Sequence, residues 1–190
     1  GIGLTSLAVF IASGSFIFYN TNVLNTKMSQ IDTEESSANY EKTYKQFEGL
    51  LQPDLIDLYS EVDIFPQRRE AHIEGVYTLQ NNTVSAIEEL HFTIPSYLTI
   101  SDLNIPDSEQ QLADKELGYY IYALNSPMQS GQTVDVAFTI DWLTPGFVNN
   151  SPTSSLLNNG TFFNNTEIMP MPGYQQGNEI LDNNRRRRYD

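Results

Sequence analysis

Residues 133–142, TVDVAFTIDW, alternate large apolar side chains with polar or small ones along their whole length. In an extended chain the large apolar side chains share one face: Val134, Val136, Phe138, Ile140 and Trp142. This period of two is typical of a β-strand with one buried face and one solvent-exposed face. Because five large side chains need a facing layer to cover them, we expect this strand at the centre of a β-domain.

Composition limits what kind of protein this is. A chain of 190 residues with 39% hydrophobic and 12% aromatic residues can bury one sizeable core. The formal net charge of −14 makes nucleic acid an unfavourable partner. Cysteine is absent, which excludes disulfides and thiol chemistry and leaves the redox compartment undecided. The chain begins with Gly1 rather than Met, so we expect a fragment of a longer polypeptide.

The N-terminal stretch, residues 1–19, contains no charged residue. As a helix it would be roughly 28 Å long, close to the thickness of a hydrocarbon core, and its aromatic end suits a membrane interface. We predict a transmembrane helix here, with a cleaved signal peptide or a buried core helix as the alternatives. The flank that follows carries one lysine and several acids, so the positive-inside rule places the next domain outside the cytoplasm, in the periplasm or at the cell surface.

Residues 20–53 are predicted to form a linker with one short helix. Aromatic and apolar residues recur there at steps of three and four: Tyr40, Tyr44, Phe47 and Leu51. This spacing predicts a helix over residues 36–51, with Ser36 or Ser37 as its N-cap and Pro53 after its end.

After Pro53 the period changes to two, and turn residues separate the alternating runs. We predict strands at residues 56–64, 71–79, 87–94, 97–105 and 117–124 besides 133–142, with a polar loop after Pro106. Without helices of useful length between them, these strands favour an all-β fold, an antiparallel β-sandwich or saddle, over a parallel sheet. The predicted core comprises Ile64, Tyr77, Phe92, Phe138, Ile140 and Trp142.

The β-domain is expected to cover residues 54–184, because the Asn- and Pro-rich segment after Thr144 reads as a long ordered loop with aromatic anchors. The four arginines at residues 185–188 would then belong to a basic connector, residues 185–190. A localisation signal or a lipid-binding cluster is the alternative for this run. The connector is favoured because the run lies far from the apolar N-terminal stretch.

The chain offers little for catalysis. His72 and His91 are its only histidines, neither belongs to an H-E-x-x-H motif, and we expect both on sheet faces. Glu88 and Glu89 are neighbours in a strand and therefore point to opposite faces. Asp135 and Asp141 share a face, but roughly 20 Å of strand separates them, too far for two carboxylates to flank one bond. We predict no catalytic residue and no metal site in this chain.

Five segments taken in order resemble one family: YEKTYKQFEGLLQPDL, VDIFPQRREAHIEGVYTLQNNT, LNSPMQSGQTVDVAFTI, NGTFFNNTEIMPMPGY and ILDNNRRRR. They are similar to the membrane-tethered, aminopeptidase N-like zinc peptidases of bacteria, in particular those fused behind an ABC transporter permease. The resemblance covers essentially the whole chain, and the NGTFF…PGY segment is its most specific part. It implies that residues 1–19 end a permease portion and that a β-saddle opens a peptidase half.

The G-x-M-E-N and H-E-x-x-H motifs of that family are absent here and would lie downstream. The resemblance therefore implies a non-catalytic N-terminal β-domain that scaffolds the catalytic domain of the same polypeptide and walls its substrate cleft. Zinc is expected only in that downstream domain. The candidate contact residues are Asn159, Gly160, Thr161, Phe162, Phe163 and Tyr174.

A second hypothesis needs no downstream domain. The chain would then be a stand-alone binding module, an extracytoplasmic β-sandwich held at the membrane by one helix, which recognises a peptide or a glycan. Extending the reading frame at both ends separates the two hypotheses. A catalytic domain downstream favours the first, and a stop codon just after Asp190 favours the second.

Overall fold

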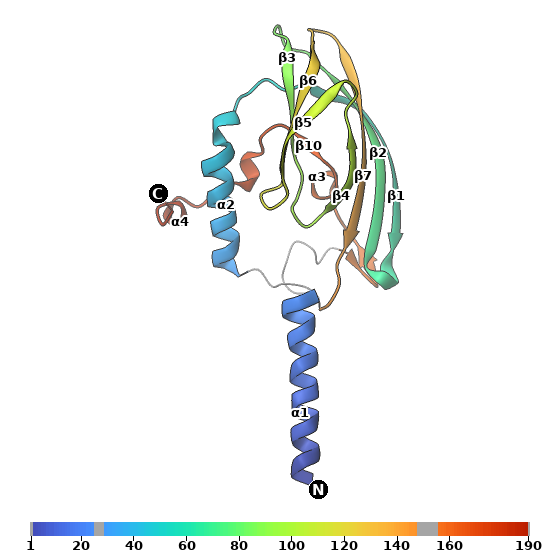
Figure 1. Ribbon diagram of the computed structural model, residues 1–190, viewed down its shortest axis with the longest axis vertical. Coiled ribbons are helices and arrows are strands. Elements are labelled where there is room, and N and C mark those ends of the chain that lie inside the picture. Colours follow the sequence, from blue (N-terminus) through green and yellow to red (C-terminus); the bar gives the residue numbers. More distant parts are fainter. Residues whose placement is uncertain (1, 25–28, 148–155, 190) are drawn as a thin grey trace.

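The computed structural model describes residues 2–24, 29–147 and 156–189. Gly1, residues 25–28, residues 148–155 and Asp190, which belong to the expected membrane helix, linker, loop and connector, lie outside the described residues. Two four-stranded antiparallel sheets form the body of the molecule (Figure 1). Sheet A has the strand order β1-β2-β7-β4, and sheet B has the order β10-β3-β6-β5. The antiparallel β-sandwich predicted from the sequence is therefore confirmed.

The strands of sheet A are β1 (Asp54–Phe65), β2 (Glu70–Gln80), β7 (Thr133–Leu143) and β4 (Thr99–Asn104). Those of sheet B are β10 (Met171–Pro172), β3 (Ile87–Thr93), β6 (Tyr119–Met128) and β5 (Ser108–Asp114). Strand β7 lies between β2 and β4, which is the central position that its alternation predicts. A further two-stranded hairpin joins β8 (Leu156–Leu157) to β9 (Gly160–Thr161).

The core lies between the inner faces of the two sheets. Of the six residues predicted for it, five are buried: Tyr77, Phe92, Phe138, Ile140 and Trp142. Gly75 of β2 is opposite Phe138 of β7, and a Cβ atom at Gly75 would lie only 2.3 Å from Cζ of the Phe138 ring. The ring therefore occupies the space that any other residue at position 75 would fill.

One prediction about the core and one about the strands need correction. Ile64 is 39% exposed rather than buried, because β1 is an edge strand of sheet A and the inner layer does not fully cover it. The predicted polar loop after Pro106 contains a strand, β5, whose residues are mostly exposed and polar. Its pairing with β6, from Ser108 opposite Leu124 to Asp114 opposite Tyr119, forms a strand that its own alternation does not reveal.

The linking helix, α2 (Gln30–Tyr44), begins and ends earlier than residues 36–51. Ser29 is the N-cap, and it forms a capping box with Asp32 that satisfies two backbone donors at the helix start. Ser36 and Ser37 lie inside the helix, and the chain after Tyr44 continues as a short 3-10 helix, η2 (Lys45–Phe47). The apolar spacing identifies only the last turns, because the first turns are polar and depend on the cap.

Helix α1 (Ile2–Phe18) and a π-helical continuation, η1 (Tyr19–Leu24), project from one end of the sandwich (Figure 1). No residue of α1 is buried, so it is not a core helix of this domain. Together they form an apolar helix of 23 residues, long enough to cross a membrane, and a signal sequence would have the same properties. Phe16 near its end contacts Phe147 after β7, with ring centroids 5.6 Å apart.

Replacing Phe138 with Ala should lower the free energy of unfolding by about 3–5 kcal/mol, since the ring is buried against β2. Ile64→Ala should cost no more than about 2 kcal/mol, because the edge position is partly exposed. Urea unfolding of the full chain in detergent, followed by the fluorescence of the single tryptophan, Trp142, measures both. Equal losses for the two variants would show that the centre of sheet A is not where the core is packed.

Candidate interdomain contact surface

The candidate residues at 159–161 lie in the β8–β9 hairpin. Leu156 pairs with Thr161 and Leu157 with Gly160, which leaves Asn159 in the turn. Leu156 is fully buried in the main core and anchors the hairpin to the sandwich. The hairpin contacts the 3-10 turn η3 (Pro66–Arg68) between β1 and β2, at the end of the sandwich from which α1 projects (Figure 1).

The three aromatic candidates have different surroundings. Phe163 packs against the main core, and its ring centroid lies 5.6 Å from that of Trp142. Tyr174 stacks on Tyr40 of α2 at 5.1 Å and donates a hydrogen bond to Glu179. Phe162, in contrast, is 79% exposed. Phe163 and Tyr174 thus pack within their own domain, and of the three aromatic candidates Phe162 alone exposes its ring.

A helix covers the outer face of sheet B. An aromatic cluster fills the space between them: Tyr40, Tyr44, Phe47, His91, Tyr119 and Tyr174. Tyr44 stacks on Tyr119 at 4.1 Å and donates a 2.6 Å hydrogen bond to Asp114 of β5. Burial raises the pKa of Tyr44, with the Asp114 carboxylate adding to the effect, so this hydroxyl stays protonated and remains a donor. Helix α2 and the aromatic cluster therefore cover the outer face of sheet B.

Ion pairs attach the C-terminal segment to α2. Arg186 of α4 (Asn183–Arg186) lies 3.1 Å from Glu41 and 2.8 Å from Glu179, and Lys45 lies 2.9 Å from Glu179. Burial opposes the ionisation of Glu179, but the hydrogen bonds from Lys45 and Tyr174 and the charge of Arg186 outweigh it, so its pKa is lowered. Arg185 contacts Glu34, which is buried, at 3.5 Å. Arg185 and Arg186 of the basic run at residues 185–188 thus form ion pairs within the domain.

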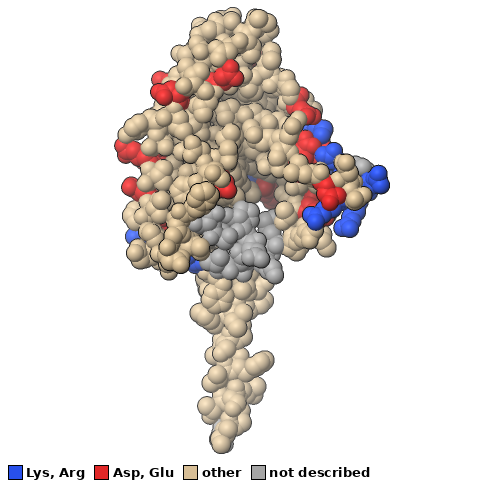
Figure 2. Space-filling model, turned by 180° about the vertical axis from the view of Figure 1, so that it is seen from behind, with Lys and Arg blue, Asp and Glu red and all other residues tan. Residues whose placement is uncertain are grey.

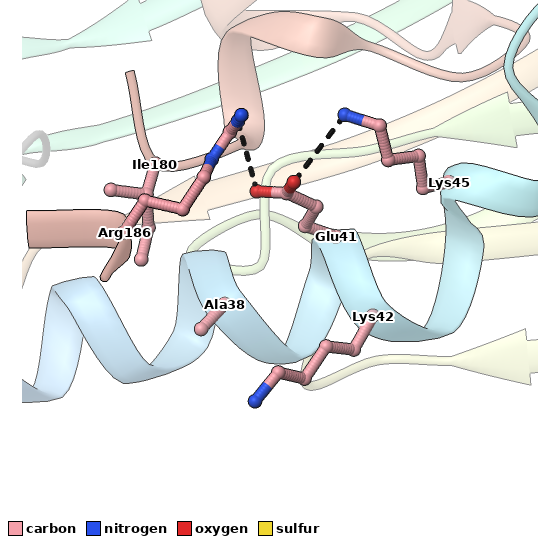
Figure 3. A pocket seen from close by; sticks show the side chains of 6 residues that line it. All are labelled: Ala38, Glu41, Lys42, Lys45, Ile180 and Arg186. Carbon is pink, nitrogen blue, oxygen red and sulfur yellow. Dashed lines mark hydrogen bonds and ion pairs between the residues drawn. The ribbon is translucent and has the colours of Figure 1, made fainter. Parts of the chain in front are cut away.

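The pocket in Figure 3 lies in this crease, between α2 and the C-terminal segment, and encloses ≈ 250 Å³. Figure 3 shows the side chains of Arg186 and Lys45 directed at Glu41, while Lys42 extends away from it. Two of the three basic residues that line the pocket, Lys45 and Arg186, already pair with Glu41 and with Glu179. We therefore interpret it as a surface crease between ion-paired elements rather than as a ligand site.

The two histidines lie on the outer faces of different sheets. His72 of sheet A bonds Asp141 through Nδ1 at 2.7 Å and Glu74 through Nε2 at 3.3 Å, and Asp141 also accepts a hydrogen bond from Ser101. Ser101, Asp141 and His72 are the residue types of a catalytic triad, but here the Asp141 carboxylate lies between the Ser101 hydroxyl and the His72 imidazole. A serine nucleophile needs direct contact with its base, so this order does not suit nucleophilic catalysis. Asp135 bonds Thr78 and takes no part in this group.

His91 of sheet B is buried beneath α2. Its Nδ1 lies 3.0 Å from the Tyr119 hydroxyl, and its Nε2 lies 3.4 Å from Glu89. In the part of the chain that the structure describes, no group of three or more His, Asp or Glu side chains is placed to hold a metal ion. His91 is a structural residue of the aromatic cluster, a role that no local sequence signal indicates.

Comparison with known proteins gives weak similarities only. No family model and no curated protein matches the sequence. The fold is similar to part of an M1 zinc metallopeptidase from Deinococcus radiodurans, with a TM-score of 0.39 and 10% identity over 52% of this chain and 22% of that one. A two-domain M1 zinc metallopeptidase gives 0.40 and 10% over 61% and 30%, and the chitin-binding domain of a Pyrococcus furiosus chitinase gives 0.24 and 15% over 52% and 86%. Similarities this weak assign the chain to no family, and the chain spans 22–30% of these metallopeptidases.

Substitution of the two adjacent phenylalanines should separate core from surface. Phe163→Ser should lower the free energy of unfolding by about 2–4 kcal/mol, because the ring packs on Trp142. Phe162→Ser should change it by less than about 0.5 kcal/mol, because the side chain is exposed. Urea titration of the full chain in detergent measures both, and a large loss for Phe162→Ser would place that ring in the core.

The histidines predict opposite dependences of stability on pH. Burial lowers the pKa of His91 against the opposing effect of Glu89, so its contribution is complete above about pH 6.5 and declines as the pH falls through that value. Hydrogen bonds to Asp141 and then Glu74 raise the pKa of His72, so its contribution is complete below about pH 6.5 and is lost as the pH rises through the raised pKa.

Between about pH 7.5 and pH 5.5, His91→Gln should therefore weaken the decrease in the urea midpoint that acidification causes. His72→Gln, the matched control, should strengthen the same decrease. An unchanged pH profile for His91→Gln would mean that this imidazole is not held neutral by its burial.

Proposed function

We propose that this chain is the non-catalytic, membrane-anchored β-domain of a larger polypeptide, in which it scaffolds a zinc aminopeptidase-like catalytic domain and walls its substrate cleft. Two observations support the proposal. One is the order of the five sequence segments that resemble this peptidase family, and the other is the surface that α2 leaves uncovered on the sandwich. Zinc would be held by the catalytic domain and not by residues of this chain. An ABC transporter permease fused before α1 is part of the same proposal.

The observation that carries the proposal is the exposure of Phe162. The hairpin that presents it is anchored by the buried Leu156, so the ring is held in a defined place rather than on a free loop. The outer face of sheet B is already covered by α2. A partner domain therefore finds open surface at the hairpin end and along sheet A, and an exposed aromatic ring on a rigid support is a typical contact residue.

The proposed location follows from α1. A helix without buried residues and with no charge over its length suits a bilayer, and the acidic flank after it supports an extracytoplasmic side for the sandwich. Because the hairpin lies at the end of the sandwich nearer α1, the catalytic domain would dock close to the membrane (Figure 1). The membrane itself is the competing contact for Phe162, since aromatic rings also favour the interface.

The test uses the polypeptide extended through its reading frame and reconstituted in nanodiscs. Phe162→Ser should weaken the docking of the downstream domain, seen as faster limited proteolysis of the junction and a lower kcat/KM for an aminoacyl substrate. Glu109→Ser, an exposed change on β5, is the matched control and should alter neither.

Two outcomes would contradict the proposal. One is a reading frame without a catalytic domain. The other is a Phe162→Ser protein with normal docking and activity, in which case a blue shift of a fluorescent label at position 162 on membrane binding would assign the ring to the bilayer instead.

A further inference from the structure

The two sheets have four edge strands, and one of them differs from the other three. On one side of sheet B the edge strand is β10, which is only two residues long, and other residues bond the part of β3 that β10 leaves unpaired. Strand β10 pairs with its end, Gly173 donates its N–H to the carbonyl of His91, and the Gln52 side chain bonds the backbone of both Glu89 and His91. Few backbone groups remain on this edge for another strand.

Strands β4 and β5 are the short edges, six and seven residues long. Each contains a register irregularity, between Ile100 and Asp102 in β4 and between Gln110 and Leu112 in β5. Short length and bulges are the devices by which natural proteins prevent the addition of a further strand. Neither edge is suited to pair with a long segment.

Strand β1 lacks these protections. It is twelve residues long, and its one irregularity lies at its beginning, between Leu55 and Asp57. From there the pairing with β2 is regular to Phe65. No described strand pairs with its other edge. A long regular edge of this kind exposes backbone donors and acceptors that match an incoming strand.

The side chains of β1 add apolar contacts to the open backbone. Leu58, Val62 and Ile64 lie opposite the inward-facing residues of β2, yet Ile64 is 39% exposed. Leu55 and Ile56 are also exposed, at 43% and 49%. One more strand beside β1 would cover this inner-face margin, which the sandwich itself leaves open.

Charge restricts what that strand can be. Four acids lie on β1, and it has no lysine or arginine: Asp54, Asp57, Glu61 and Asp63. Glu74 and Asp141 continue the acidic character on the outer face of β2 and β7. A second copy of β1 would bring like charges together, which opposes self-pairing. Arg185 and Arg186 pair with Glu34, Glu41 and Glu179 on the far side of the sandwich, where α4 lies beyond α2 and basic and acidic side chains gather (Figures 1 and 2). Arg68, which follows β1, pairs with Glu70 of β2 and lies over the ring of Phe65.

We infer that the edge of β1 binds a basic segment of a separate polypeptide in an extended conformation, which joins sheet A as a fifth strand. Backbone hydrogen bonds to β1 supply affinity, and lysine or arginine side chains opposite Glu61 and Asp63 supply specificity. This surface is distinct from the Phe162 hairpin. It does not depend on the presence of a catalytic domain.

The experiment uses the full chain in nanodiscs of neutral lipid and a labelled twelve-residue peptide of alternating lysine and valine, matched to the length of β1. Binding is followed by fluorescence anisotropy, and hydrogen exchange reports the β1 amides, which should become protected. Glu61→Lys with Asp63→Lys should weaken binding about tenfold or more, because two attractions become repulsions.

The control variant, Glu109→Lys with Glu116→Lys, makes the same change of charge near the β5 edge and should retain most of the affinity. Two control peptides should bind poorly: one with glutamate for lysine, and one with a central proline, which cannot donate to the ladder. Phe162→Ser should leave peptide binding unchanged, which separates this inference from the proposed docking of a catalytic domain.

Equal weakening by both double variants would reduce the binding to general attraction between a basic peptide and an acidic chain, and would overturn the inference. Unchanged exchange of the β1 amides would overturn it as well. So would a dimer of the full chain that dissociates on Glu61→Lys with Asp63→Lys, since the occupant of the edge would then be a second copy.

Discussion

The close approach of the Phe138 ring to Gly75 is the constraint on which the arrangement of sheet A depends. Because position 75 carries no Cβ, β7 can place a large ring over the backbone of β2 and still keep a regular register with it. The inner face of sheet A then packs on sheet B through residues such as Tyr77, Trp142 and Phe92. Once both inner faces are used in this way, the outer faces, the strand edges and the ends of the sandwich remain to interact with anything else.

The outer faces of the two sheets differ in what covers them. On sheet B, Tyr119 and His91 project toward α2, and the stacked tyrosines of the helix bury them. The C-terminal segment reinforces this cover through Tyr174 and through Arg186, which pairs with Glu41 and Glu179. On sheet A, the outer face carries acids and the partly exposed His72 with its carboxylate partners, and no helix of the described residues covers it. The domain is thus asymmetric, with a closed side and an open side.

This asymmetry gives the two proposed contacts separate places. The hairpin with Phe162 lies near the end of the sandwich that carries α1, where an anchored domain would meet a neighbouring domain or the membrane. The edge of β1 runs along the open side and offers backbone rather than aromatic contacts. Both contacts are proposals in which the domain would act by positioning other polypeptides.

The sequence by itself determined where strands with a regular alternation lie, that they form an antiparallel β-sandwich, and that an uncharged helix precedes them. Alternation and charge are local properties, so they can be read from neighbouring residues. Tertiary structure alone decided that the polar run of β5 pairs with β6, that Ile64 is exposed at an edge, and that Phe163 and Tyr174 turn inward while Phe162 does not. Each of these depends on which distant element packs against the residue, because burial and strand pairing are contacts between segments and leave no periodic trace in either one.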